Sequence, residues 1–528
     1  MARQAQAAEL RSVNPATLEP VGTVRISPPE EVAEVVAEAR LAAERWAQST
    51  FADRRALLGR VAAELLDAAD EIAATVTAET GKPLVESYTA ELFVALDNLV
   101  WAASNASLVL RPERLRHPQP HLRHKRGWLL YEPLGVIGVI SPWNFPLGIA
   151  LTQAFFAVAA GNAVVVKPSE LAPLSGVWAE RVFRAAGVPA GLVRVVQGGA
   201  ATGDAVVRSP GVGKVVFTGS RATGRLVAAA AGERLRPVTL ELGGKDPMLV
   251  FEDADFDRAV AGAVWGSFSN CGQVCSAVER IYVARPLHEA FVEELARRAR
   301  RLRIGESREL QTELGPLVAE ERRNHVEELV ADALSRGGEL RTGGSRPELG
   351  LPGWFHEPTV LTGVEREARI EREEIFGPVV TVAPFADEDE AVRLANGSSF
   401  GLGASVWTSD LERARRLARR LEAGSVWTND VSYSYGTGQA SWGGTKESGF
   451  GRTHSKHGLY ELSRVKFADL DRGRVPVPWW YPYDEGVLSG FRGMAGVLYG
   501  EGLKRKLGSA WRHRRGLLRL GRRYLSGS

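Results

Sequence analysis

The stretch GVIGVISP, residues 135–142, is a short run of β-branched residues that ends in proline, and similar runs follow it along the chain. Longer helix-forming segments separate these runs. A continuous apolar strand of this length is typical of a parallel sheet that is buried on both faces by its crossover helices. The sequence therefore predicts an α/β fold with a doubly wound parallel sheet. The later runs are AVVVKPSE (163–170), LVRVVQGG (192–199), GKVVFTGS (213–220) and PMLVF (247–251).

A second group of strands indicates a second α/β domain from about residue 245 to 435. Its runs are RIYVA (280–284), PTVLTGV (358–364), PVVTVAPF (378–385) and SVWT (425–428). Ahead of the first sheet, residues 30–110 favour helices. Apolar side chains recur there at three- and four-residue spacing in segments 30–48 and 54–83, and Gly81 and Pro83 end the second segment.

Composition indicates a soluble globular protein of more than one domain. A chain of 528 residues is too long for one hydrophobic core, and 45% hydrophobic with 24% charged residues is an ordinary balance. Two cysteines cannot build a disulfide framework, and the N-terminal residues lack an apolar export segment, so we expect a cytoplasmic setting. The longest apolar run, residues 154–166, is shorter than the roughly 20 residues of a membrane span and predicts buried core.

The charge is distributed unevenly. The net charge is +3, yet the segment after Glu501 carries nine lysines and arginines and no acid, so the rest of the chain has a net charge of −6. This asymmetry favours a C-terminal appendage with its own partner.

Both cysteines, Cys271 and Cys275, lie in SFSNCGQVCSA (267–277). A cysteine that attacks carbon needs thiolate character and access from a cleft, and Gly272 allows close backbone approach. A zinc site would need more ligands than this pair of cysteines supplies. A Cys–His hydrolase would need a histidine near the cysteine, and all the histidines of the chain are distant from it in sequence. From this stretch alone, two small buried thiols are an equally good reading.

The sequence contains seven short motifs in a fixed order, which are SPWNFP (141–146), KPSE (167–170), FTGS (217–220), ELGGK (241–245), NCGQVC (270–275), EEIFGP (373–378) and GGTKESGFGR (443–452). Together they make the sequence similar to the aldehyde dehydrogenase superfamily over roughly residues 12–470. The resemblance implies a Rossmann-like cofactor domain, a catalytic domain and a small oligomerisation β-sheet. It assigns 1–123 with 134–244 to NAD binding, 245–440 to catalysis and 124–133 with 455–470 to oligomerisation strands, and it leaves 471–528 as a basic extension.

Carried over by position, the family's nucleophile falls on Cys275. The resemblance implies that its thiolate attacks an aldehyde, and that the side-chain amide of Asn144 and the backbone N–H of Cys275 hold the oxyanion. Glu241 matches the general base that activates water. Family members that pass the acyl group to coenzyme A usually lack this base, so we expect the product to be a free carboxylic acid. No metal ion is expected in the site. Cys271 could form a reversible disulfide with Cys275, or simply be a small residue that fits.

The cofactor implied by the resemblance is NAD. VGKVVFTGSRATG (212–224) reads as strand, turn and helix start, where helix N-terminal amides favour a pyrophosphate. Because a carboxylate at Glu170 would bind both ribose hydroxyls and repel a 2′-phosphate, NAD is preferred over NADP. The residues placed at the cofactor are Trp143, Lys167, Glu170, Gly219, Ser220, Leu242, Glu374 and Phe376.

The substrate is predicted to be an apolar aliphatic or aromatic aldehyde. Related enzymes that oxidise succinic semialdehyde hold its carboxylate with two arginines, and those positions are Ser269 and Thr152 here, which disfavours a semialdehyde. Two classes of function are open: an active enzyme, and a binding or scaffold protein that is catalytically silent. The presence of Cys275, Asn144 and Glu241 favours the enzyme. The side chains expected around the entrance are Phe145, Phe155, Phe156, Phe268 and Trp442.

The segment beyond residue 470 lies outside the resemblance. Leu503, Leu507, Trp511, Leu518 and Leu525 form one helical stripe with cations around it, which favours an amphipathic helix (503–528) on an anionic membrane surface at the inner face. Docking on a partner subunit and a disordered basic tail are the alternatives, and no nucleic acid is expected. By resemblance, the protein is a homodimer or homotetramer.

Overall fold

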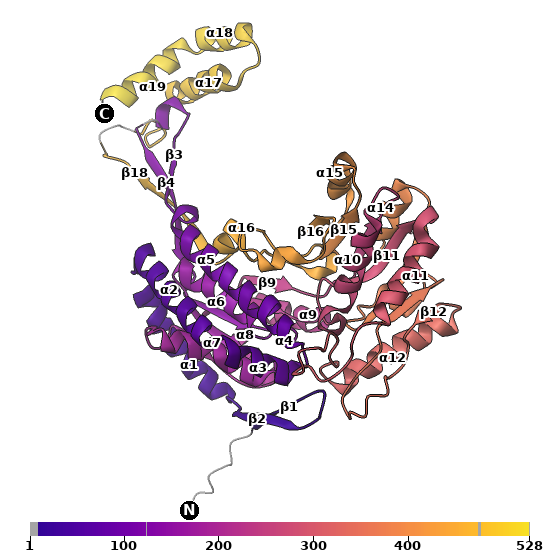
Figure 1. The fold of residues 1–528 in the computed structure, drawn as a ribbon. Helices are drawn as coiled ribbons and strands as arrows, with labels where there is room; N and C mark the ends of the chain where they lie inside the picture. Colours follow the sequence, from indigo (N-terminus) through magenta and orange to yellow (C-terminus); the bar gives the residue numbers. More distant parts are fainter. Residues whose placement is uncertain (1–8, 123, 474–476, 527–528) are drawn as a thin grey trace, which may run out of the picture. The chain divides into compact units, whose positions relative to one another are not determined.

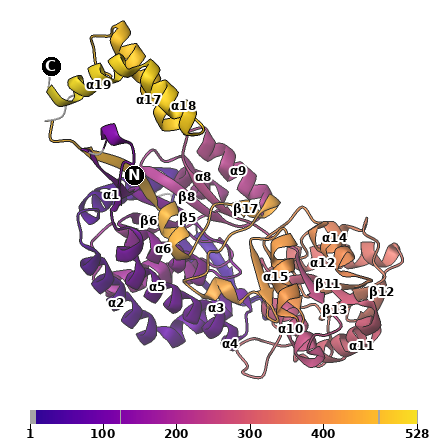
Figure 2. The ribbon, with the colours of Figure 1, turned by 90° about the horizontal axis from the view of Figure 1, so that it is seen from above.

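The computed structural model describes residues 9–122, 124–473 and 477–526. The chain forms two compact units, one of Met1–Leu110 with Glu132–Arg464 and one of Arg111–Tyr131 with Val465–Ser528. The first unit contains two large sheets, which confirms the α/β class and the two doubly wound domains (Figures 1 and 2).

The first sheet has the order β17-β9-β8-β5-β6-β7 and is parallel except for its edge pair β17–β9. The chain first builds outward from β5 through β6 to β7 and then returns to β8 on the other side of β5. Such a reversal opens a crevice at the carboxyl ends of the strands. The strands are β5 (Val136–Ile140), β6 (Ala163–Lys167), β7 (Val193–Val195), β8 (Val212–Thr218), β9 (Val238–Glu241) and β17 (Gly449–Phe450).

Helices cover both faces of this sheet. Helix α6 is buried along its whole length because the sheet lies on one side of it and α2 and α5 lie on the other, so the apolar run 154–166 is core as predicted. The predicted helix over 54–83 is two helices, which meet at Ala68 (φ −98°, ψ 8°). The helices are α1 (Pro29–Trp46), α2 (Phe51–Asp67), α3 (Ala69–Thr80), α6 (Gly148–Ala160), α7 (Pro173–Ala185), α8 (Ala200–Arg208) and α9 (Arg221–Gly232), and a hairpin of β1 (Glu9–Val13) and β2 (Pro20–Arg25) precedes them.

The second sheet has the order β12-β13-β14-β11-β10-β15-β16, with β12 as the antiparallel edge. Its strand β10 alternates between two cores: Met248 and Val250 pack with one set of helices, and Leu249 packs with the other. The run PMLVF, grouped above with the first sheet, therefore belongs to the second. The strands are β10 (Asp246–Val250), β11 (Val278–Ala284), β12 (Glu339–Thr342), β13 (Thr359–Thr362), β14 (Val379–Phe385), β15 (Gly403–Trp407) and β16 (Ser425–Thr428).

Helices α10, α11 and α12 bound the larger core of this domain, and α14 and α15 bound the smaller one (Figure 2). Two short helices complete the unit. The bounds are α10 (Phe256–Phe268), α11 (His288–Ala299), α12 (Glu320–Ser335), α13 (Arg369–Arg372), α14 (Glu388–Asn396), α15 (Leu411–Arg420) and α16 (Ser455–Glu461).

One helical stretch, Leu84–Val109, is long and apolar enough to cross a membrane by length and composition, with a mean hydropathy of 1.4. It consists of α4 (Leu84–Ser87), a π-helical turn (Tyr88–Leu92) and α5 (Phe93–Val109). The stretch packs against α2 and α6, and a third of its most apolar window is buried within the fold. Buried core helices of proteins that do not cross a membrane can be equally long and apolar.

The second unit contains most of a three-stranded sheet, β18-β4-β3, and three helices. The expected strand segment 455–470 is only partly correct, because residues 455–461 form α16 and the strand begins at Ser463. Three helices occupy most of the described part of 485–526, so the alternative of a disordered tail does not hold for that segment. The elements are β3 (Glu113–Leu115), β4 (Arg126–Pro133), β18 (Ser463–Leu470), α17 (Glu485–Tyr499), α18 (Leu503–Arg512) and α19 (Arg514–Ser526).

Candidate active site

The cysteine loop leaves α10 through an unusual backbone path. Asn270, Cys271 and Gly272 all have left-handed backbone angles, with φ of 49°, 56° and 68°. A Cβ on Gly272 would lie 2.1 Å from the carbonyl oxygen of Gly377, so only glycine fits there. The loop is held by Glu86 of α4, whose Oε2 accepts a 2.8 Å hydrogen bond from the backbone N–H of Asn270. This path carries the chain into the cavity where Cys275 lies.

The two cysteines have different surroundings. Cys271 is buried in the larger core of the second domain, together with Met248 and Phe268. Cys275 is half-buried and lines the cavity. Both thiols are free. Only Cys275 is therefore placed to meet a small molecule.

Asn144 lies beside the cysteine loop and is tied to it. Its Nδ2 donates a 3.0 Å hydrogen bond to the backbone oxygen of Gln273. In return, Nδ2 of Asn270 donates to the backbone oxygen of Asn144 over 3.1 Å. Since an amide nitrogen carries two hydrogens, one N–H of Asn144 remains for another acceptor.

Glu241 ends β9 as a buried carboxyl. Neither side-chain oxygen has a hydrogen bond of normal geometry to another described residue, although the Trp442 side chain lies close enough to interact with the carboxyl. Burial raises its pKa to about 8, and the charge of Arg452 and the Trp442 side chain only partly oppose this rise. A carboxyl with this pKa can take up or release a proton near neutral pH.

The Cys275 thiol is electrostatically coupled to three carboxyls. Burial raises its pKa above the ordinary value, and the charges of Asp246, Glu374 and Glu241 raise it further. The thiol is thus neutral at physiological pH in this state. Making a thiolate requires a proton acceptor close by or a nearby positive charge.

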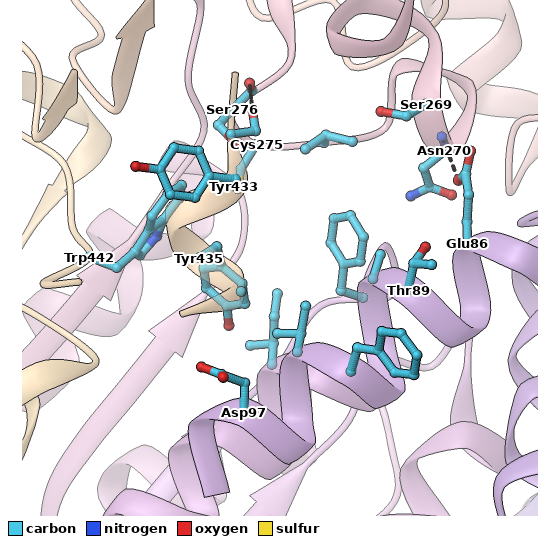
Figure 3. Close-up of a pocket in the computed structure, with 18 of the residues that line it drawn as sticks. Glu86, Thr89, Asp97, Ser269, Asn270, Cys275, Ser276, Tyr433, Tyr435 and Trp442 are labelled. Atoms are coloured by element: carbon cyan, nitrogen blue, oxygen red, sulfur yellow. Dashed lines mark hydrogen bonds between the residues drawn. The ribbon is translucent and has the colours of Figure 1, made fainter. Parts of the chain in front are cut away.

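The cavity beside Cys275 has a volume of about 690 Å³ (Figure 3). Helix residues from the 84–109 stretch form one wall, and Trp442, Tyr433 and Tyr435 stand opposite them. The polar groups in the lining include two acids, Glu86 and Asp97, and none of the described residues that line it is a lysine, arginine or histidine.

The predicted entrance residues are only partly correct. Phe145, Trp442 and Ser269 line the cavity. The other three phenylalanines and Thr152 do not line it, and they are buried in the packing of α6 and α10. The cavity wall formed by α5 was not predicted from the sequence, although that helix is strongly apolar. The α5 side chains that line the cavity include Phe93, Val94, Leu96 and Val100.

The residues predicted for the cofactor lie largely at the carboxyl ends of the first sheet. Lys167 ends β6, and its Nζ lies 3.0 Å from Glu170 Oε2. Ser220 follows β8 and caps α9, because its side chain accepts a hydrogen bond from the Thr223 N–H. The N-terminus of a helix that follows a strand, as at Ser220, is a favourable place for an anion.

The turn between β8 and α9 is packed closely. The N–H of Gly219 donates to the backbone oxygen of Glu241 over 3.0 Å, and a Cβ on Gly219 would meet the Phe217 ring at 2.7 Å. A Cβ on Gly224 would lie 2.5 Å from Leu242. Gly224 therefore permits the close approach of α9 to Leu242, and Gly219 leaves room for the Phe217 ring at the turn.

The remaining predicted residues meet near the ELGGK segment. Glu374 Oε1 accepts a 3.1 Å hydrogen bond from the Gly244 N–H, and a Cβ on Gly243 would collide with the Glu374 carboxylate. Burial raises the pKa of Glu374 to about 8. The rings of Trp143 and Phe376 contact edge to face at 5.4 Å.

Comparisons with known proteins agree with this geometry. The Aldehyde dehydrogenase family model matches residues 2–468. The chain is 37% identical over 482 residues to a betaine aldehyde dehydrogenase of Bacillus subtilis, covering 90% of this chain and 97% of the relative. It is 36% identical over 488 residues to a peroxisomal aminoaldehyde dehydrogenase of Pisum sativum, covering 89% and 94%. A crystal structure of the Staphylococcus aureus betaine aldehyde dehydrogenase in complex with NAD⁺ superposes with a TM-score of 0.86 at 34% identity, covering 91% of this chain and 95% of that one. The chain belongs to the aldehyde dehydrogenase family.

Proposed function

We propose that this enzyme uses NAD to oxidise an apolar aliphatic or aromatic aldehyde to the free carboxylic acid. The observation that carries the proposal is the cavity beside Cys275, whose walls are mainly aliphatic and aromatic and whose lining holds no cation. An aldehyde with an apolar tail would bury that tail there.

In the first step, Sγ of Cys275 bonds to the carbonyl carbon while the thiol proton moves to a neighbouring carboxylate. Glu241 suits this role because its charge acts on the Cys275 thiol and its pKa is about 8. The negative charge that develops on the carbonyl oxygen is stabilised by the free N–H of Asn144 and the backbone N–H of Cys275.

NAD, when bound, supplies a nicotinamide ring that accepts hydride from the substrate carbon. The residues present fit a dinucleotide: the α9 N-terminus at Ser220 suits the pyrophosphate, and Lys167 with Glu170 suits the adenine-side ribose. Glu374, with Phe376 and Trp143, would orient the nicotinamide ribose. The family member solved with NAD⁺ supports this assignment.

The acyl group is then released from Cys275 by water. Once Glu241 has passed the thiol proton to solvent, its ionised form takes a proton from the water as the water attacks the thioester. The C–S bond then breaks, the Cys275 sulfur takes a proton back from Glu241, and the acid leaves. Burial of Glu241 makes it a stronger base than an exposed carboxylate.

The test is NADH formation by the full chain, without coenzyme A, against aliphatic aldehydes of increasing length, benzaldehyde and succinic semialdehyde. We expect kcat/KM to rise with chain length and to be lowest for succinic semialdehyde, with no turnover in Cys275→Ala. A preference for succinic semialdehyde would overturn the apolar assignment. Absence of turnover with every aldehyde would favour the scaffold reading.

A cationic aminoaldehyde is the second candidate substrate. Asp97 lines the cavity, where it accepts a 2.9 Å hydrogen bond from the Gly438 N–H, and aromatic rings surround the same space. A carboxylate with aromatic faces attracts an ammonium group. The relatives named for betaine aldehyde and aminoaldehydes support this alternative. If it holds, Asp97→Asn will lower kcat/KM for an ω-aminoaldehyde at least tenfold and leave hexanal unchanged.

We further propose that the enzyme is a homodimer or homotetramer in the cytoplasm. The three-stranded sheet β18-β4-β3 offers edge strands for pairing. Peripheral attachment to the inner face of an anionic membrane is proposed for the C-terminal helices, because their cations and exposed apolar side chains lie together. Leu525 of the predicted stripe lies outside the residues whose side chains the structure describes.

A further inference from the structure

The second unit encloses a cavity of its own, with a volume of about 460 Å³. Its walls are almost wholly apolar and come from Trp479 and from α17 and α19, including Phe491, Met494, Leu517 and Leu520. A volume of this size falls in the range of small-molecule sites, roughly 300–1,000 Å³.

Loose helix packing does not explain the cavity. Helix α17 carries Gly486, Gly490, Gly493 and Gly496 along one side. A Cβ on Gly490 would lie 2.5 Å from the Gly516 oxygen, and one on Gly496 would lie 1.9 Å from Ser509 Oγ. Helix α17 thus packs closely on α18 and α19 (Figure 1). The cavity thus lies beside the closely packed contact of α17 with α18 and α19. Apolar side chains that line such a cavity lack packing contacts on one side, which favours an apolar ligand.

The cavity wall also carries polar atoms. Tyr524 Oη lies 3.1 Å from Nδ1 of His124, whose Nε2 is 3.3 Å from Asp471 Oδ2. The Nδ1 atom of His121 is buried without a hydrogen-bond partner within the described ranges, and its ring meets Trp479 edge to face at 5.5 Å. The site thus offers a polar atom to a mainly apolar ligand.

An exposed apolar stripe flanks this cavity. Leu503, Leu507 and Trp511 are 72%, 60% and 71% exposed. At about 3.6 residues per turn, they share one side of α18 with Ala510, which lines the cavity. Ser509, on the opposite side, packs against α17. The stripe therefore lies on the side of α18 that carries the cavity residue Ala510.

Positive charge borders the same surface. The helical periodicity places Lys504 and Lys506 at the two edges of the stripe, and the Arg514 guanidinium lies over the Trp511 ring at 4.5 Å. No acid occurs after Glu501. A ligand on this surface would meet apolar walls and cations together.

We propose that the C-terminal unit is a binding site for an anionic amphiphile with one long alkyl chain. The alkyl chain occupies the cavity between α17 and α19, and the anionic head lies at the edge of the stripe, where Lys506 is the nearer lysine to the cavity residue Ala510 and Lys504 borders the other edge. Such a molecule can be a free fatty acid or a lipid within an anionic bilayer. The site is independent of Cys275 and of the aldehyde that the enzyme oxidises.

Two glycines provide a matched pair of variants. Gly521 lines the cavity, and a Cβ added there meets nothing within 4 Å. Gly508 is equally open but does not line the cavity. Leucine is tolerated better than glycine inside a helix, so both Gly521→Leu and Gly508→Leu should fold. Only the first fills the cavity.

The measurement is calorimetric titration of the full chain with myristate below its aggregation concentration. Gly521→Leu should weaken binding at least tenfold, and Gly508→Leu should not change it. Lys504→Gln/Lys506→Gln should weaken binding more than Arg512→Gln/Arg515→Gln, which removes equal charge. Tetradecyltrimethylammonium should bind at least tenfold more weakly than myristate. Both leucine variants should keep wild-type NADH formation, which separates this site from catalysis.

Co-sedimentation with phosphatidylglycerol and phosphatidylcholine vesicles distinguishes the two sources of the ligand. If Gly521→Leu no longer binds phosphatidylglycerol vesicles while wild type and Gly508→Leu still do, the ligand is a lipid of the bilayer. If the wild-type protein binds myristate but no vesicles, the ligand is a free amphiphile. The proposal fails if neither probe binds, if Gly521→Leu binds like Gly508→Leu, or if the cationic amphiphile binds as tightly as myristate.

Discussion

Glu86 Oε2 accepts a 2.8 Å hydrogen bond from the backbone N–H of Asn270, and so connects helix α4 to the loop that carries the nucleophile. Asn270 and Cys271 adopt left-handed angles that non-glycine residues seldom adopt. Glu86 is one of the contacts that hold this conformation. Burial raises its pKa to about 7, while the charge of Lys82 and the Asn270 N–H lower it.

Glu86→Ala should lower kcat/KM about tenfold, because it leaves the Asn270 N–H without its acceptor, a cost of about 1–3 kcal/mol. Glu86→Gln keeps an acceptor oxygen and should stay within threefold of wild type. Steady-state kinetics of both variants tests this, with the KM for NAD as control. Equal losses in both variants would show that charge, not the hydrogen bond, matters.

Glu241 should govern the pH dependence of turnover. A base must be ionised, and its pKa is raised to about 8, so kcat should rise with pH around a midpoint near 8 when thioester hydrolysis limits the rate. Glu241→Gln should remove this rise, and because Glu241 also accepts the thiol proton, the burst of NADH should form more slowly than in wild type. A flat kcat profile in wild type would contradict the assignment.

The same group affects stability. Since its folded pKa lies above the unfolded value, the native state binds more protons between about pH 4.5 and 8, and the contribution of Glu241 to stability falls as pH rises through that window. Glu241→Gln should therefore gain stability over wild type more at pH 9 than at pH 5. Urea unfolding at both pH values measures the difference.

The motif residues could be located from the sequence because each follows a strand or opens a helix in a fixed order. Cys275, Asn144 and Glu241 converge only through three elements far apart in the chain, and spacing alone could not show their contacts. Several strands escaped prediction, among them β15 and β9, which are interior strands of the two domains' sheets. GASVW of β15 lacks a continuous β-branched run, and VTLE of β9 is only four residues long.

The cavity walls were harder to predict. The stretch 84–109 is apolar on most of its sides, so its periodicity did not separate the face on α2 and α6 from the face that lines the cavity. The glycines of α17 recur at helical spacing, which is a readable sign of close helix packing. The volume beside that packing depends on three helices and a loop, which no local pattern specifies.

A buried ion pair supports the segment that carries Glu374 and Phe376. Lys245 Nζ lies 2.7 Å from Glu279 Oε2, and the Glu279 carboxylate also accepts hydrogen bonds from the N–H groups of Ile375 and Phe376. Lys245→Met should destabilise the fold by about 3–5 kcal/mol, because it leaves a buried carboxylate without its cation. The exposed pair Arg341–Glu289 is the control, and Glu289→Gln should cost less than about 1 kcal/mol. Similar urea midpoints for the two variants would refute this.

Glu170 should set the preference for NAD. Its carboxylate is half exposed at the end of β6, beside Lys167. Glu170→Gln removes the charge that repels a 2′-phosphate while Lys167 remains, so the ratio of kcat/KM for NAD over NADP should fall about tenfold, or about 1.4 kcal/mol. Initial rates with each cofactor at a fixed aldehyde concentration measure the ratio. An unchanged ratio would place the discrimination elsewhere.

Cys271 should not protect the nucleophile. Its side chain lies in the core with Met248 and Phe268, whereas Cys275 lines the cavity, so a disulfide would require the left-handed loop to rearrange. Cys271→Ala should lose activity in hydrogen peroxide at the wild-type rate, and a reductant should restore both proteins to the same extent. Unfolding in urea serves as the control, because a small cavity left by the missing sulfur lowers stability without changing the oxidation rate. Faster irreversible loss in the variant would establish the protective disulfide instead.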